Sequence, residues 1–123
     1  MIKKIYRLKE REIKKVLRER KPFFSYGIVL NRFKNKLPYN RFAIVLGSKS
    51  VKSWVERNFF RRKFYDFISE KKLMDSSLHF WEWFYDLVFV VKKQTKLEKK
   101  EQKSINEFEQ NLKFLIKNKW KKY

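Results

Sequence analysis

A segment near the start of the chain places apolar residues at the spacing of an amphipathic helix. Residues 8–20 are mostly charged, and their apolar positions are Leu8, Ile13, Val16 and Leu17. This pattern predicts a short helix with one apolar stripe. Further on, Ser53 and Glu56 form a Ser-x-x-Glu capping box, which predicts a helix over residues 54–71.

Apolar runs rich in β-branched and aromatic residues predict the strands. Residues 23–33 and 41–47 form two such runs, and residues 36–40, which contain a Pro and an Asn, are predicted to be the hairpin connection between them. Residues 85–92 form a third run, apolar at nearly every position. A continuous apolar run of this length predicts a strand that is buried on both faces.

A second capping box, Ser104 to Glu107, predicts a last helix that ends near Trp120. Its apolar stripe is Ile105, Phe108, Leu112, Leu115 and Ile116. The element order is then a helix, two or three strands, a helix, a strand and a helix, which is α-β-β-β-α-β-α if the first runs supply three strands. We expect one α+β domain over residues 1–123, a two-layer sandwich in which a small mixed sheet is packed with three helices.

The charge of the chain indicates that the domain binds a partner. Lys and Arg number 33 against 13 Asp and Glu, for a net charge of +20. The basic residues cluster in residues 1–21, 31–72 and 92–123, whereas residues 22–30 and 73–91 contain none. We therefore expect a basic face and a polyanionic partner. Nucleic acid is the commonest such partner of a small basic domain, with an anionic membrane surface or an acidic protein as alternatives.

Several kinds of chemistry lack the residues they need. The chain has no Cys, and His79 is its one histidine, so neither a thiolate metal site nor a histidine-based triad is expected. The acidic residues form no paired-carboxylate motif of the kind that a two-metal nuclease needs. The longest apolar run, near residues 87–91, is too short to span a bilayer, and we expect a cytoplasmic protein. Trp81 and Trp83 could form a base-stacking platform. Because no Lys or Arg lies near them in the sequence, we expect core or hydrophobic contact residues instead.

The predicted helix 54–71 carries the candidate site. Arg57, Arg61 and Tyr65 follow one another at i, i+4 and i+8, and Asn58 and Arg62 form a second pair beside them. Guanidinium groups one turn apart suit consecutive phosphates, Asn58 can donate to a phosphate or a base edge, and Tyr65 can stack or hydrogen-bond. The alternative is a solvated helix face with scattered arginines, and spacing alone does not decide between the two.

Residues 41–51 followed by residues 55–62 resemble the signature of the ribonuclease P protein component, whose core is an R-N-R sequence. Other segments are similar to further family motifs in the same order: Arg7-Leu8-Lys9 to R-L-K, residues 28–30 to F-V-L, and residues 85–93 to the Y-D-[IV]-V strand. The resemblance thus covers nearly the whole chain.

This resemblance implies a fold like that of domain 2 of ribosomal protein S5. It also implies a non-catalytic protein subunit that binds a catalytic RNA and precursor tRNA, one protein per RNA, and assists removal of the 5′ leader. Mg²⁺ is expected to be held by the RNA and not by protein side chains. The implied RNA contacts are Lys49, Arg57, Asn58, Arg61 and Arg62, which the stripe extends to Tyr65. Ile13, Leu17 and Asn31 fall where the family's leader cleft carries aromatic residues, and Phe33 lies two residues further along the same strand face.

The chain departs from the family pattern at several of these positions. Phe59 replaces the second Arg of the R-N-R core, Lys52 replaces a Gly, Trp54 replaces an Ala, and Tyr65 replaces the Arg that closes the helix stripe. Together with the replacement of the cleft aromatics by Ile13, Leu17 and Asn31, these changes bear on the grip on the leader more than on docking to the catalytic RNA. A structural RNA-binding protein of ribosomal type shares the charge and remains the alternative function, and a basic membrane-surface protein is a weaker one.

Overall fold

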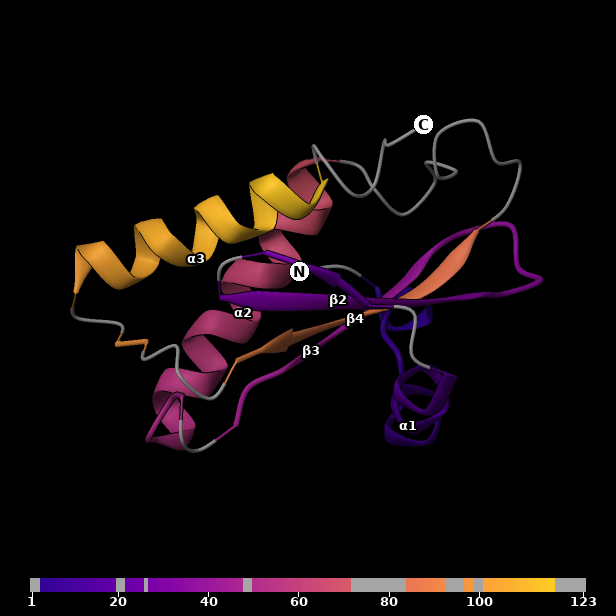
Figure 1. Ribbon diagram of the computed structural model, residues 1–123, viewed down its shortest axis with the longest axis horizontal. Coiled ribbons are helices and arrows are strands. Elements are labelled where there is room, and N and C mark those ends of the chain that lie inside the picture. The colour runs from indigo at the N-terminus through magenta and orange to yellow at the C-terminus, as the bar shows by residue number, and fades with distance from the viewer. Residues whose placement is uncertain are drawn as a thin grey trace.

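A mixed sheet of four strands forms the centre of the computed structural model (Figure 1). The structure describes residues 3–19, 22–25, 27–47, 50–71, 84–92, 97–98 and 101–116. Its helices are α1 (Glu10–Glu19), α2 (Trp54–Glu70) and α3 (Gln102–Leu115), with a 3₁₀ turn at Lys4–Tyr6. Its strands are β1 (Pro22–Phe24), β2 (Ile28–Lys34), β3 (Arg41–Val45) and β4 (Tyr85–Val91), and they lie in the order β1-β2-β4-β3.

The predicted α+β sandwich and its element order are confirmed. Helices α2 and α3 cover one face of the sheet, and the short α1 lies against the other (Figure 1). The larger core joins the α2 and α3 face of the sheet to the two helices through residues such as Phe42, Phe60, Phe64, Phe89 and Phe108. A smaller cluster on the α1 face contains Leu8, Val16, Ala43 and Val88.

The hairpin predicted between residues 23–33 and 41–47 is wrong. β2 and β3 do not pair with each other, because β4 lies between them, antiparallel to β2 and parallel to β3. The central place goes to β4 since it is the strand whose residues are apolar on both faces. The connection 35–40 is instead fixed to β4 by two amides: Asn35 donates to Asp86 at 2.9 Å, and Asn40 accepts from the Tyr85 N–H at 2.8 Å.

The segment 23–33, predicted as one strand, is two strands that form a hairpin. The Ser25 N–H donates to the Ile28 carbonyl at 3.0 Å and closes the turn. Asn111 of α3 accepts from both the Ser25 hydroxyl and the Gly27 N–H, at 2.8 and 2.7 Å. Since the residue that holds the turn lies 84 positions away from Gly27, no local pattern could show it.

Of the two predicted capping boxes, the first supplies a side-chain cap. Ser53 accepts from the Glu56 N–H at 3.1 Å and begins α2 as predicted. Ser104 is not the N-cap of α3. This helix starts earlier, at Gln102, and Ser104 is buried within its first turn. The predicted end near Trp120 falls outside the described residues.

Candidate nucleic-acid interface

Three of the predicted contact residues, Asn58, Arg61 and Arg62, lie at the surface of α2. Phe60, Phe64 and Ile68 of the same helix pack into the larger core. Asn58 and Arg61 are half-buried, and Arg62 is exposed. The structure therefore places these polar residues at the surface of the helix, where phosphates can reach them.

Asn58 and Arg61 form a pair within this surface. One Arg61 Nη donates to the Asn58 Oδ1 at 2.8 Å. This bond occupies one of the five N–H donors of the guanidinium group and fixes its direction. An arginine held in this way loses less side-chain entropy when it binds a phosphate than a freely rotating one would.

Arg57 has a second task in the fold. Its Nη1 donates to the carbonyls of Val51 and Lys52, at 2.9 and 3.3 Å. The side chain thereby ties the segment before α2 to the first turns of the helix. Arg57 and Arg61 were predicted to bind consecutive phosphates. Arg57 has fewer donors left for a phosphate, because it also holds this segment of the backbone in place.

Tyr65, predicted on the same stripe, is covered. Its side chain is 5% exposed, with the Arg7 guanidinium 6.0 Å from its ring centroid and the Phe42 carbonyl 3.5 Å from its hydroxyl. Burial raises the pKa of this hydroxyl, although Arg7 and Arg61 act to lower it. Stacking of a base on this ring does not fit the arrangement, because the N-terminal segment lies over it. The reason is a bridge between Arg7 and Phe42 that adds the segment to the edge of β3.

A groove joins this part of α2 to α1. Its cationic lining comes from Lys4, Arg7, Lys9 and Arg61, and Ile13 and Tyr65 also line it. A residue predicted to contact the catalytic RNA and one predicted to line the leader cleft thus share one hollow.

A second hollow lies beside it, between the N-terminal segment, α1 and the start of β3. Basic side chains dominate its lining, namely Lys4, Arg7, Lys9, Arg11, Lys15, Arg18 and Arg41. The carboxylate in its wall, Glu12, is paired with Arg41. The hollow is therefore positively charged and suits an anion.

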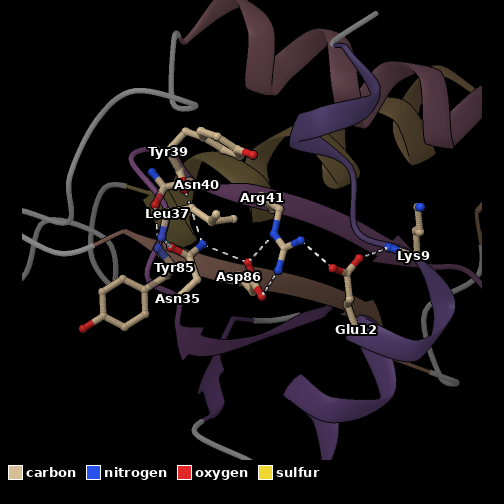
Figure 2. A network of polar contacts seen from close by, with 9 residues as sticks. All are labelled: Lys9, Glu12, Asn35, Leu37, Tyr39, Asn40, Arg41, Tyr85 and Asp86. Carbon is tan, nitrogen blue, oxygen red and sulfur yellow. Dashed lines mark hydrogen bonds and ion pairs between the residues drawn. The ribbon is translucent and has the colours of Figure 1, made fainter.

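A polar network holds α1 in position (Figure 2). Arg41 donates to Asp86 through Nε at 2.8 Å and Nη2 at 2.7 Å, and through Nη1 it pairs with Glu12 of α1. The hydrogen bond to Asp86 is the main cause that raises the Arg41 pKa. Burial acts to raise the Glu12 pKa, but the Lys9 N–H and Arg41 outweigh it, so the pKa of this carboxyl lies below its usual value.

The four predicted cleft residues all belong to the α1 side of the sheet. Ile13, Leu17 and Phe33 are half-buried and pack against the smaller core cluster. Asn31 is buried and pairs in register with Val88, a member of that cluster. The Lys15 ammonium lies 5.0 Å from the centre of the Phe33 ring, which places a cation beside this aromatic side chain.

Some of the residues considered lie outside the part of the chain that the structure describes. These are Lys49, His79, Trp81 and Trp83. Among the described residues, His, Asp and Glu form no group that could hold a metal ion. No helix within the described ranges is long and apolar enough to cross a membrane.

The basic residues of the N-terminal segment, which line the groove beside Arg61, were not predicted as part of the site, because the prediction considered only the spacing of residues within α2. Arg7 and Lys9 lie more than forty positions before the helix in the sequence and reach it only through the sheet edge. The one available signal was charge: residues 1–21 hold ten Lys and Arg.

Comparison with known proteins places this geometry in a family. The model of the family described as Ribonuclease P matches residues 2–119. No curated protein matches the sequence. A structure of the Staphylococcus aureus RNase P protein superposes with a TM-score of 0.70 at 17% identity, and the match covers 91% of this chain and 93% of that one. A mutant of the same protein, described as defective in mRNA degradation activity, gives 0.70 at 16% identity, with 93% and 87% covered.

The solved structures share the fold, and the family model spans nearly the whole sequence. The resemblance seen in the sequence motifs is thereby confirmed, and the chain belongs to the ribonuclease P protein family.

Proposed function

We propose that this chain is the non-catalytic protein subunit of ribonuclease P. It binds the catalytic RNA and the 5′ leader of precursor tRNA, and it assists Mg²⁺-dependent cleavage that produces mature tRNA 5′ ends. The observation that carries the proposal is the basic groove in which Arg61 of α2 and Ile13 of α1 meet. One surface of the protein can therefore contact two RNA segments at once.

In this proposal the exposed side of α2 contacts the catalytic RNA. Arg61 and Arg62 neutralise phosphates, Asn58 aims Arg61 and offers its amide to RNA, and Arg57 adds its remaining donors. Lys49 belongs to the same proposed contact. Each phosphate contact releases counterions, so binding weakens as salt rises.

The leader is proposed to lie on the α1 side of the sheet, near Ile13, Leu17, Asn31 and Phe33. The aliphatic side chains here offer less stacking area than aromatic ones, so we expect the grip on the leader to depend more on phosphates and on the neighbouring cations. Mg²⁺ acts in the RNA, where phosphates supply the oxygen ligands it prefers. The protein works in the cytoplasm as one copy per RNA.

Reconstitution tests the proposal. The ribonuclease P RNA of the same cells is mixed with precursor tRNA at a Mg²⁺ concentration that barely supports cleavage by RNA alone. Addition of the protein should raise the cleavage rate, and protein alone should cleave nothing. Arg61→Ala and Arg62→Ala should reduce the stimulation strongly. Lys113→Ala, which removes an exposed cation from α3, should not.

The same experiment addresses the alternative, a structural RNA-binding protein of ribosomal type. Such a protein would bind RNA through its charge, and each lost phosphate contact would reduce the salt slope of binding by about one unit. If the wild-type protein leaves cleavage by the RNA unchanged, while Lys113→Ala and Arg61→Ala weaken RNA binding equally, the alternative is correct.

A further inference from the structure

Trp54 is the most exposed of the large apolar side chains that the structure describes, at 70%. It is the first residue of α2. A solvated tryptophan is unusual, because its large ring gains more than most side chains from leaving water. This side chain therefore needs an explanation, and the described part of the fold does not supply one.

The ring lies on the same side of α2 as the candidate contact residues. Asn58 and Arg61 follow Trp54 at i+4 and i+7, which places Asn58 about 40° to one side of Trp54 and Arg61 about 20° to the other side around the helix axis. Along the axis, Trp54 and Arg61 are separated by roughly 10 Å. The nearest carboxylate in sequence, Glu56, lies about 200° around the helix, on the other side.

These surroundings favour one class of partner. A protein partner would require a contiguous apolar patch, but the other exposed apolar residue of this turn, Val55, points about 100° away from Trp54. A lone aromatic ring beside guanidinium groups matches a nucleotide instead, since the base offers a flat π-face and the phosphate offers the charge. The family motif that this segment resembles has Ala at the position of Trp54.

We propose that Trp54 is a stacking site for an unpaired nucleobase of the RNA whose phosphates contact the Arg61 side of α2. This inference rests on the proposed function and deepens it. It assigns to the helix a preference for single-stranded RNA at its first turn, beyond the sequence-independent attraction to phosphate.

Binding of labelled RNA by the full-length protein tests the proposal. Three probes are used: an oligoadenylate of about 12 nucleotides, which matches the site sizes of single-strand binders, an RNA duplex of the same length, and an abasic strand with the same phosphates. Trp54→Ala should weaken oligoadenylate binding about tenfold. Binding of the duplex and of the abasic strand should change less than about twofold, because no phosphate contact is removed.

Substitutions separate stacking from simple apolar contact. Trp54→Phe keeps a ring and should retain most of the affinity, whereas Trp54→Leu should lose as much as Trp54→Ala does. Val55→Ala, an exposed apolar change on the same turn, is the matched control and should have no effect. Urea unfolding of each variant should coincide with that of the wild type, since both side chains are exposed.

Two results would overturn the inference: equal oligoadenylate affinity of Trp54→Ala and the wild type, or full affinity of Trp54→Leu. Failure of the proposed function is seen separately, as a wild-type protein that binds oligoadenylate through Trp54 but does not stimulate cleavage by the catalytic RNA.

Discussion

Removal of the Asp86 carboxylate should destabilise the fold far more than removal of a surface carboxylate. Asp86 accepts three hydrogen bonds, two from Arg41 and one from Asn35, and its side chain is 8% exposed. In Asp86→Ala the Arg41 guanidinium remains largely inside the protein, at 20% exposure, without its main partner. Loss of one partner of a buried pair typically costs about 3–5 kcal/mol.

Two features of the site reduce that magnitude. Arg41 keeps its pairing with Glu12, and one-fifth of its side chain still reaches water. We therefore expect Asp86→Ala to lower the free energy of unfolding by about 2–3 kcal/mol. With a urea m-value of about 1.5–2 kcal/mol/M, typical of a domain of this size, the midpoint should fall by roughly 1–2 M.

Equilibrium urea unfolding followed by circular dichroism measures this loss. Glu10→Ala is the control: it removes an exposed carboxylate whose pair with Lys14 spans one helical turn, and it should cost about 0.5 kcal/mol or less. The double variant Arg41→Met with Asp86→Leu should lie closer to the wild type than either single variant, since it removes both charges of the most buried pair. Glu12 loses Arg41, but its side chain is 31% exposed to water and still accepts from the Lys9 N–H. The reasoning is refuted if Asp86→Ala costs no more than Glu10→Ala at an unchanged m-value.

Three further predictions concern single side chains. The folded-state pKa of Glu12 is depressed, so its charge stabilises the fold above the unfolded pKa of about 4.3 and loses this effect as pH falls through the lower folded pKa. Urea unfolding should therefore show that the wild type is more stable than Glu12→Gln at neutral pH, and this difference in the free energy of unfolding should disappear in acid. Arg57→Ala should lower both stability, by about 1 kcal/mol, and RNA affinity, whereas Arg62→Ala should lower the salt slope of RNA binding and leave the unfolding midpoint in place. Ser53→Ala removes the cap of α2 and should lower the unfolding free energy by about 1 kcal/mol; an unchanged midpoint would show that the first turn does not depend on its cap.

The elements with strong local signals could be predicted from the sequence. β4 is apolar at every position except Asp86, and α2 has both an apolar stripe and a side-chain cap at Ser53. Burial and capping act within a few residues, so they leave a readable pattern. The position of β4 between β2 and β3 could not be predicted from local signals, because it depends on which strand gains most free energy when both of its faces are buried.

Contacts between distant residues escaped the sequence for a physical reason. The partners Arg41 and Asp86 lie 45 positions apart, and Asn111 lies 84 positions from the Gly27 turn that it holds. Asp86 and Asn111 are buried, Arg41 is half-buried, and each is hydrogen-bonded, as buried polar groups must be, but burial becomes known only when the sheet order is known. Spacing alone could not indicate which polar residues of the chain are buried.

The stripe on α2 shows how the same limit shapes the site. Helical spacing places Trp54, Arg61 and Tyr65 on one side of α2, yet Trp54 is exposed and Tyr65 is buried. The difference arises because the N-terminal segment bridges Phe42 at the sheet edge and lies over the later turns of the helix but not over the first. That cover removes a stacking ring from solvent, and in exchange it brings Arg7 and Lys9 into a groove with Arg61. The free ring at Trp54 and the charged groove near Tyr65 therefore divide the helix into a part suited to bases and a part suited to phosphates.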